Sequence, residues 1–183
     1  MVTAFVALLR GINVGGRNPV AMPDLADCFR AAGFGDVGTY LQSGNVVFTA
    51  ASGRADALEA DVGRLLTARF GFDIPTVVRS REQFAGVIAA APPDHGSDDR
   101  RSDVMFLKPP LTAQEVLAQM PELRANVDAV APGPGVVYFS RDAKLATKTR
   151  IQRFMSMPVF QQITMRSWST TTRLATLLAG LPE

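Results

Sequence analysis

The stretch that decides the fold is TAFVALL at Thr3–Leu9, which leads directly into RGINVGGRNPV at Arg10–Val20. A nearly continuous apolar run is typical of a central strand that is buried on both faces of its sheet. Pro23 then stands where a first helical turn would begin, and Asp24 beside it suits the positive end of a helix dipole. The N-terminal sequence therefore predicts a buried strand, a glycine-rich loop and a helix.

Two short runs rich in β-forming residues come next, at Gly38–Gln42 and Asn45–Ala50. Gly44 lies between them and can supply the positive φ that a tight turn requires, so the two runs predict a β-hairpin. Apolar residues at helical spacing from Leu58 to Phe70 predict a second helix, and Ile74–Val78 predicts a fourth strand. This order is the ferredoxin-like β-α-β-β-α-β arrangement, in which two helices cover one face of an antiparallel sheet.

The second half of the chain predicts another set of helices and strands. In order, these are a helix at Arg81–Ala91, an exposed loop at Pro92–Ser102, a strand at Asp103–Leu107, a helix at Thr112–Met120 with a capping box, a hairpin of Val127–Val130 with Val136–Ser140, and a helical tail broken at Pro158. We therefore predict an α+β fold with a ferredoxin-like lobe at residues 1–80. A second α+β lobe with C-terminal helices occupies residues 81–183, and the two lobes pack closely or form one domain.

Composition and residue counts restrict the class of protein. Of the 183 residues, 47% are hydrophobic and 20% are charged, which is typical of a globular chain and argues against disorder. No apolar run approaches the roughly 20 residues of a membrane-spanning helix, and the apolar N-terminus lacks the flanks of a secretory signal. Cys28 is the only cysteine, so no disulfide can form within the chain. We therefore expect a cytoplasmic protein that does not enter the membrane.

Candidate catalytic residues are scarce. His95 is the only histidine and lies in the polar stretch, so a serine or cysteine nucleophile paired with histidine is not expected. Cys28 falls on the apolar stripe of its predicted helix, where a packed thiol is the expected state. One cysteine and one histidine cannot supply the ligands of a usual zinc site, so no metal site is predicted. No catalytic residue and no cofactor can be assigned, and the sequence leaves open whether the protein is an enzyme.

Three segments together resemble a known bacterial family. They are RGINVGGRN at Arg10–Asn18, QSGNVVF at Gln42–Phe48 and TMRSWSTTTRL at Thr164–Leu174. On these motifs the chain is similar to the family called domain of unknown function 1697, and the likeness extends along the whole chain. The family has Arg-Asn-Trp where this chain has Arg166, Ser167 and Trp168, so the third segment is a partial match. The resemblance implies an α+β protein with a ferredoxin-like portion, and it implies no activity, cofactor or catalytic residue.

The glycine-rich loop is the strongest candidate for a binding site. Its glycines could let successive backbone N–H groups converge on an anion, and Arg10 and Arg17 could clamp a phosphate or carboxylate. Alternatively, the glycines only permit a turn, and Asn13 ties the loop together. Because the first and third strands are neighbours in the predicted sheet, Ser43 and Asn45 are expected beside the loop. The candidate ligand-binding residues are Arg10, Gly11, Asn13, Gly15, Gly16, Arg17, Ser43, Asn45, Arg166 and Trp168.

Positive charge gathers in the C-terminal third. Between Tyr138 and Ala175 there are seven basic residues and one acidic residue, a local charge of +6, which leaves −4 for the rest of a chain whose net charge is +2. The cluster suits the phosphates of a nucleic acid or another anionic partner, although a solvated basic face would explain it too. An RNA-recognition module would need exposed aromatic residues at alternate strand positions, and only Phe5 and Phe48 are available.

The sequence leads to one preferred function and two alternatives. We expect a protein that binds an anionic ligand, either a phosphate-bearing small molecule or a nucleic acid, through the glycine-rich loop and the basic C-terminal region. The first alternative is an enzyme that acts on a small phosphorylated or carboxylated metabolite in a cleft between the lobes. The second is a structural or oligomeric protein that uses the edge of the hairpin.

Overall fold

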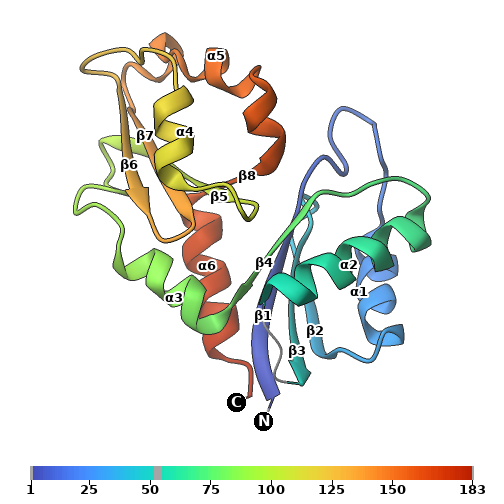
Figure 1. Ribbon diagram of the computed structural model, residues 1–183. Coiled ribbons are helices and arrows are strands. Elements are labelled where there is room, and N and C mark those ends of the chain that lie inside the picture. Colours follow the sequence, from blue (N-terminus) through green and yellow to red (C-terminus); the bar gives the residue numbers. More distant parts are fainter. Residues whose placement is uncertain (1, 52–54, 183) are drawn as a thin grey trace. The chain divides into compact units, whose positions relative to one another are not determined.

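The computed structural model describes residues 2–51 and 55–182 of the chain. The chain forms two compact units (Figure 1). Unit 1 combines Met1–Ala85 with Leu174–Glu183, and unit 2 is the continuous stretch Gly86–Arg173. Each unit has a four-stranded antiparallel sheet and a hydrophobic core. The α+β fold class that the sequence predicts is therefore confirmed.

Unit 1 contains the predicted β-α-β-β-α-β order of elements. Its strands and helices are β1 (Val2–Leu9), α1 (Met22–Ala31), β2 (Gly35–Tyr40), β3 (Asn45–Ala51), α2 (Ala55–Phe70) and β4 (Thr76–Ser80). The strands lie in the order β2-β3-β1-β4, and each neighbouring pair is antiparallel. The predicted hairpin is formed by β2 and β3, and the predicted central strand is β1, which pairs with both β3 and β4.

Strand β1 is buried on both faces, as its apolar run predicts. Phe5 and Leu9 belong to the core cluster that residues of α1 and α2 also join. Val6 and Leu8, which point to the opposite face of the strand, are fully buried as well. Within the core, the ring of Phe48 on β3 stacks 5.7 Å from the ring of Phe5, a contact that adds to the stabilisation from burial alone.

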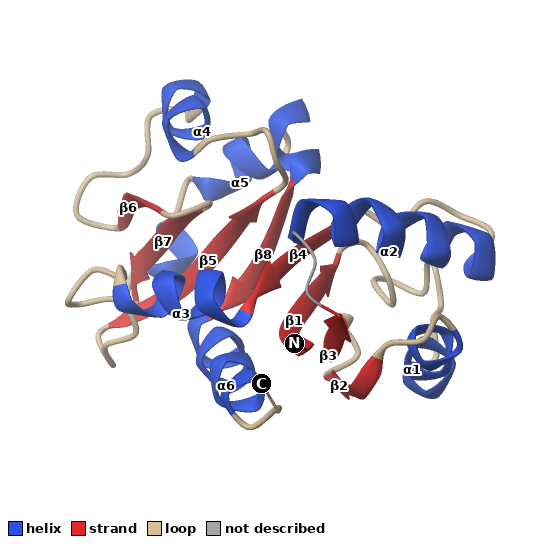
Figure 2. Cartoon of the chain, turned by 60° about the horizontal axis from the view of Figure 1, so that its bottom comes forward, coloured by secondary structure: helices blue, strands red, loops and turns tan. Residues whose placement is uncertain are grey.

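Unit 2 repeats the connectivity of unit 1, although no repeat of residues is visible in the sequence. It begins within α3 (Arg81–Ala89) and ends within α6 (Trp168–Ala179). Between these helices lie, in chain order, β5 (Arg100–Leu107), α4 (Ala113–Gln119), β6 (Asp128–Gly133), β7 (Val136–Asp142), α5 (Ile151–Met155) and β8 (Ile163–Ser167). The sheet has the order β6-β7-β5-β8 (Figure 2). Strand β5 thus takes the place of β1, the β6–β7 hairpin that of β2–β3, and β8 that of β4.

Strand β8 corrects the prediction for the C-terminal region. The sequence predicts only helices there, but Ile163–Ser167 pairs antiparallel with β5 and forms an edge of the second sheet. The strand is short, and its residues do not alternate between buried and exposed. Ile163 and Met165 pack on the core, and Thr164 and Arg166 between them are buried as well. An arginine that is only 9% exposed breaks the polar-outward pattern by which a half-buried strand is identified.

The polar stretch Pro92–Ser102 is only partly the exposed loop that the sequence predicts. Strand β5 begins at Arg100 rather than at Asp103, because Arg100 pairs with Asp142 at the end of β7. His95 is also buried, although most residues around it are exposed. Both differences come from contacts with residues that are distant in the sequence, so local composition could not indicate them.

Candidate functional site

Seven of the ten predicted site residues lie on two loops at one end of the first sheet, and an eighth, Asn45, begins strand β3 beside them. The glycine-rich loop follows β1, and a short turn at residues 41–44 joins β2 to β3. In the sheet, Asn45 at the start of β3 pairs with both Leu8 near the end of β1 and Tyr40 at the end of β2. The two loops therefore leave the sheet side by side, as the predicted strand order requires.

The glycine-rich loop is itself a small hairpin. Val14 and Arg17 form an isolated antiparallel bridge, and the N–H of Arg17 donates to the carbonyl oxygen of Val14 at 3.0 Å. Gly15 and Gly16 occupy the two central positions, with φ of +58° and +73°. Positive φ at both central residues is the signature of a type I′ turn, which strongly favours glycine. The pair of glycines is thus explained by the turn that it forms.

Asn13 ties the loop to itself and to its neighbour. Its side-chain amide nitrogen donates to the carbonyl oxygens of Val20 and Gln42, both at 2.9 Å, and its side-chain oxygen accepts from the N–H of Val20 at 2.8 Å. The N–H of Asn13 donates in turn to the carbonyl oxygen of Asn18. The amides of Asn13, Arg17 and Val20 are thus used inside the loop, while an anion nest built from its other amides stays a prediction.

The remaining predicted residues of unit 1 flank this arrangement. The backbone N–H of Arg10 donates to the carbonyl oxygen of Pro75, and burial lowers the pKa of the Arg10 guanidinium. The side chain of Arg17 is exposed at the loop's tip. Asn45 donates to the carbonyl oxygen of Tyr40 at 2.6 Å and to the hydroxyl of Ser43 at 3.2 Å, so it closes the β2–β3 turn.

Arg166 and Trp168, the other two predicted residues, belong to unit 2. Arg166 on β8 is buried, which lowers the pKa of its guanidinium to about 10, and it donates to the carbonyl oxygen of Met165 at 3.0 Å. Trp168 is the first residue of α6 and lines an open pocket. Of the residues that line this pocket, Trp168 is the one that the sequence predicts as a binding residue.

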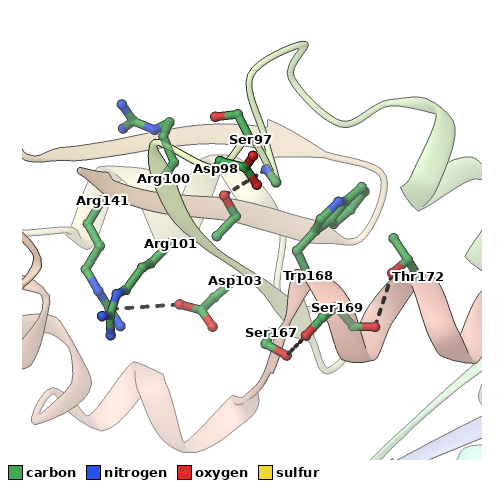
Figure 3. A pocket seen from close by; sticks show the side chains of 12 residues that line it. Ser97, Asp98, Arg100, Arg101, Asp103, Arg141, Ser167, Trp168, Ser169 and Thr172 are labelled. Carbon is green, nitrogen blue, oxygen red and sulfur yellow. Dashed lines mark hydrogen bonds and ion pairs between the residues drawn. The ribbon is translucent and has the colours of Figure 1, made fainter. Parts of the chain in front are cut away.

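The pocket of unit 2 has a cavity volume of about 620 Å³ (Figure 3). It forms where the loop before β5, the start of β5, the end of β7 and the first turn of α6 come together. Its lining consists of Gly96, Ser97, Asp98, Arg100, Arg101, Ser102, Asp103, Arg141, Ser167, Trp168, Ser169 and Thr172. Its lining carries three arginines, two aspartates and several hydroxyl groups.

The positive charge of the pocket comes from neighbouring strands. Arg101 on β5 lies directly opposite Arg141 on β7, and in the view of Figure 3 the ends of the two side chains overlap. A guanidinium nitrogen of Arg141 is 3.9 Å from a carboxylate oxygen of Asp103. Burial raises the pKa of Asp103, while Arg141 acts in the opposite direction. The third arginine of the pocket, Arg100, donates instead to the hydroxyl of Ser140 at 2.8 Å.

Hydroxyl groups surround the first turn of α6. The Ser167 side chain accepts from the N–H of Thr170 at 3.2 Å, which is the contact of an N-cap residue. The Ser167 and Ser169 hydroxyl oxygens are 3.1 Å apart, and Ser167 also donates to the hydroxyl of Thr170. The positive end of the α6 dipole and the residues Ser167 and Ser169 therefore lie at the pocket.

One wall of the pocket is a packed aromatic group. His95 meets the ring of Trp168 edge-on at 4.8 Å between centroids and the ring of Tyr138 at 5.2 Å. The Nε2 atom of His95 is buried without a hydrogen-bond partner. Gly96 lies so close to Trp168 that an added Cβ would be 2.1 Å from the indole. The only histidine of the chain thus supports the pocket wall, whereas its place in a polar stretch predicts exposure.

The burial of His95 predicts a pH dependence of stability. Burial lowers the pKa of His95, Asp94 acts to raise it and Arg100 adds to the lowering. Because the folded protein favours neutral His95, the contribution of this residue to stability is fully present above the unfolded pKa of about 6.5. The contribution is lost as the pH falls through the lower folded pKa. Urea unfolding of the wild type and His95→Gln at pH 7.5 and 5.0 checks this. The wild type should lose more stability on acidification, and equal losses would contradict the prediction.

Unit 1 holds a second, apolar depression of about 470 Å³ between α1 and α2. Cys28 and Leu65 are among its lining residues. Cys28 is buried, in agreement with the packed thiol expected from the sequence. Burial raises the pKa of this thiol, although Arg69 acts in the opposite direction, so the protonated form is favoured. In residues 2–51 and 55–182, no group of three or more His, Cys, Asp or Glu could hold a metal ion. Over the same range, no helix has the length and apolar character needed to cross a membrane.

Comparison with known proteins agrees with the fold and adds no activity. The model of a family described as protein of unknown function (DUF1697) matches residues 2–138. The solved structure of the conserved bacterial protein SP0830 from Streptococcus pneumoniae is similar, with a TM-score of 0.86 and 24% sequence identity. The similarity covers 97% of this chain and 99% of that one. Among curated proteins, no match was found.

Proposed function

The chain belongs to the DUF1697 family of proteins of unknown function, and from that premise we propose a function based on the pocket of unit 2. The pocket binds a small anionic ligand that carries phosphate or carboxylate groups. The sequence leads us to expect an anion-binding protein, and this proposal assigns the binding to the residues that line this pocket. The glycine-rich loop is not required for it.

The observation that carries the proposal is the pairing of Arg101 with Arg141. Like charges at directly opposite positions of an antiparallel pair destabilise a sheet, and two carboxylates near Arg141 offset this in part: Asp103 at 3.9 Å, and Asp128, which is opposite Arg141 on β6. An anion placed between the two guanidinium groups would relieve this repulsion. Arginine is suited to that task because its planar fork of N–H donors matches phosphate and carboxylate oxygens.

Three further features of the pocket suit a small organic anion. The first turn of α6 brings the positive end of a helix dipole and the hydroxyls of Ser167 and Ser169 to the same pocket. Trp168 provides an apolar wall against which the uncharged part of a ligand can pack. The volume of about 620 Å³ lies within the range of roughly 300–1,000 Å³ that is usual for sites of small molecules.

Isothermal titration with inorganic phosphate, at low ionic strength, tests the proposal. The wild type is expected to bind, and Arg101→Gln and Arg141→Gln are each expected to weaken binding by roughly tenfold or more, the cost of a lost charged hydrogen bond. Arg153→Gln is the matched control, because Arg153 is an exposed arginine on α5 outside the pocket. Binding that is absent in the wild type, or that all three variants reduce equally, would refute the site.

A further inference from the structure

The two paired loops of unit 1 expose aliphatic side chains. Val14 is 65% exposed in the glycine-rich loop, and Leu41 is 51% exposed in the β2–β3 turn. Asn13, the neighbour of Val14, donates to the carbonyl oxygen of Gln42, the neighbour of Leu41. Val14 and Leu41 are therefore chain neighbours of the two residues that share this hydrogen bond. We call residues 10–20 and 41–45 the paired-loop surface.

Close contacts and hydrogen bonds join the two loops of the paired-loop surface. Gly44 packs so closely on the first loop that an added Cβ would be 2.6 Å from the Ile12 side chain and 2.9 Å from that of Leu9. The N–H of Leu9 donates to the carbonyl oxygen of Gly44 at 2.8 Å. Together with the three hydrogen bonds of the Asn13 side chain, these contacts hold the loops in one arrangement. A surface that is already ordered loses little entropy when a partner binds.

The backbone of Leu41 points to a role for its side chain. Leu41 has a φ of +59°, in the left-handed region that glycine and asparagine occupy easily and bulky residues rarely adopt. The leucine at this position is nevertheless half exposed, so it adds little to the core of unit 1. Strained backbone conformations of this kind cluster at functional sites. A strained position that displays an aliphatic side chain to solvent is suited to contact with another molecule.

The charge of the surface indicates the chemistry of its partner. Residues 10–20 and 41–45 include Arg10 and Arg17 and contain no aspartate or glutamate. They also contain no aromatic residue on which a nucleic-acid base could stack. A second copy that used the same surface would bring arginine against arginine, which like-charge repulsion disfavours. A complementary partner therefore presents aliphatic side chains together with carboxylates.

We infer that the paired-loop surface is a docking site for a protein segment in which aliphatic side chains are flanked by acidic ones. Val14 and Leu41 contact the aliphatic side chains, and Arg17 pairs with a carboxylate at the rim of the contact. This site uses none of the residues that line the pocket of unit 2. Its success or failure is therefore independent of the proposed anion binding.

A random peptide display library, selected on the immobilised full chain, tests the inference. We expect enriched peptides that combine acidic and aliphatic residues. Synthetic copies of them, measured by fluorescence anisotropy, should bind Val14→Ser and Leu41→Asn roughly tenfold or more weakly than the wild type, as for truncation of an interface anchor. Asparagine suits the left-handed backbone at position 41, so Leu41→Asn removes the side chain without adding strain.

Two controls make the outcome decisive. Val2→Ser removes another exposed aliphatic side chain, outside the paired-loop surface, and should leave peptide binding unchanged. Arg141→Gln removes a pocket residue and should also have no effect on the peptides. The inference fails if no peptide is enriched, if the enriched peptides lack acidic residues, or if Val14→Ser and Leu41→Asn bind them as the wild type does. Binding of a single-stranded oligonucleotide that depends on Val14 and Leu41 would assign the surface to nucleic acid instead.

Discussion

Replacing Glu59 by alanine is expected to lower the free energy of unfolding by about 3–5 kcal/mol, the usual cost of removing one partner from a buried ion pair. Glu59 on α2 is 6% exposed, and its carboxylate lies 3.7 Å from the guanidinium of the equally buried Arg79. It also accepts a hydrogen bond of 3.0 Å from the N–H of Val78 on β4, an edge strand of the first sheet. The substitution would leave a buried guanidinium without this carboxylate and a strand amide without its acceptor.

Urea unfolding followed by circular dichroism measures this effect. Glu82→Ala is the control, because Glu82 is an exposed glutamate of α3, and its loss should change stability by less than about 0.5 kcal/mol. A double variant, Glu59→Met with Arg79→Met, should recover much of the lost stability, since an apolar pair of similar volume avoids the buried charges. A loss for Glu59→Ala no larger than that of the control would show that the ion pair is not important.

The second large effect is expected for Gly96→Ala. A left-handed backbone costs an alanine roughly 1–2 kcal/mol, and overpacking adds roughly 1–3 kcal/mol, so the total loss of stability is about 2–5 kcal/mol. Gly96 has a φ of +86°, and its missing Cβ position is filled by the indole of Trp168. The substitution must displace Trp168 and with it the wall of the pocket. Phosphate binding should therefore weaken together with stability.

Trp168 is the only tryptophan of the chain, so its fluorescence reports this displacement directly. The emission of Gly96→Ala should shift to longer wavelength as the indole becomes more exposed. Gly71→Ala is the matched control, because Gly71 has a φ of +80° and nothing within 4 Å of an added Cβ. It should lose only the backbone cost of roughly 1–2 kcal/mol and keep the wild-type emission. Identical stability losses for the two variants would remove the argument for close packing against Trp168.

Much of unit 1 could be predicted because its signals are local. Pro23 and Asp24 lie in the first turn of α1, and Gly33, with a φ of +88°, follows its end. Gly44 adopts the positive φ that the predicted hairpin requires. In unit 2 the predicted capping box is present in both halves, between Thr112 and Glu115. In each case the residue type favours one local backbone structure, so the element can be predicted without knowing any contact between distant residues.

The candidate pocket could not be predicted, because its residues meet through strand register. Arg101 and Arg141 are far apart in the sequence and become opposite neighbours only when β5 pairs with β7. The adjacent arginines at positions 100 and 101 were the available signal, since they end an otherwise acidic stretch. Anion binding by the glycine-rich loop stays a prediction, and its glycines form a tight turn that holds Val14 and Arg17 at an exposed tip.

The division of the chain has a consequence for its synthesis. Unit 2 is one uninterrupted stretch, whereas unit 1 is discontinuous and includes residues from Leu174 onward. Within unit 1, the guanidinium of Arg81 donates to the carbonyl oxygens of Leu181 and Pro182, so these late residues are fastened to the early ones. Domains usually fold in the order in which a nascent chain emerges. Here the unit whose sheet emerges first is completed last, because its residues from Leu174 onward follow all of unit 2 in the sequence.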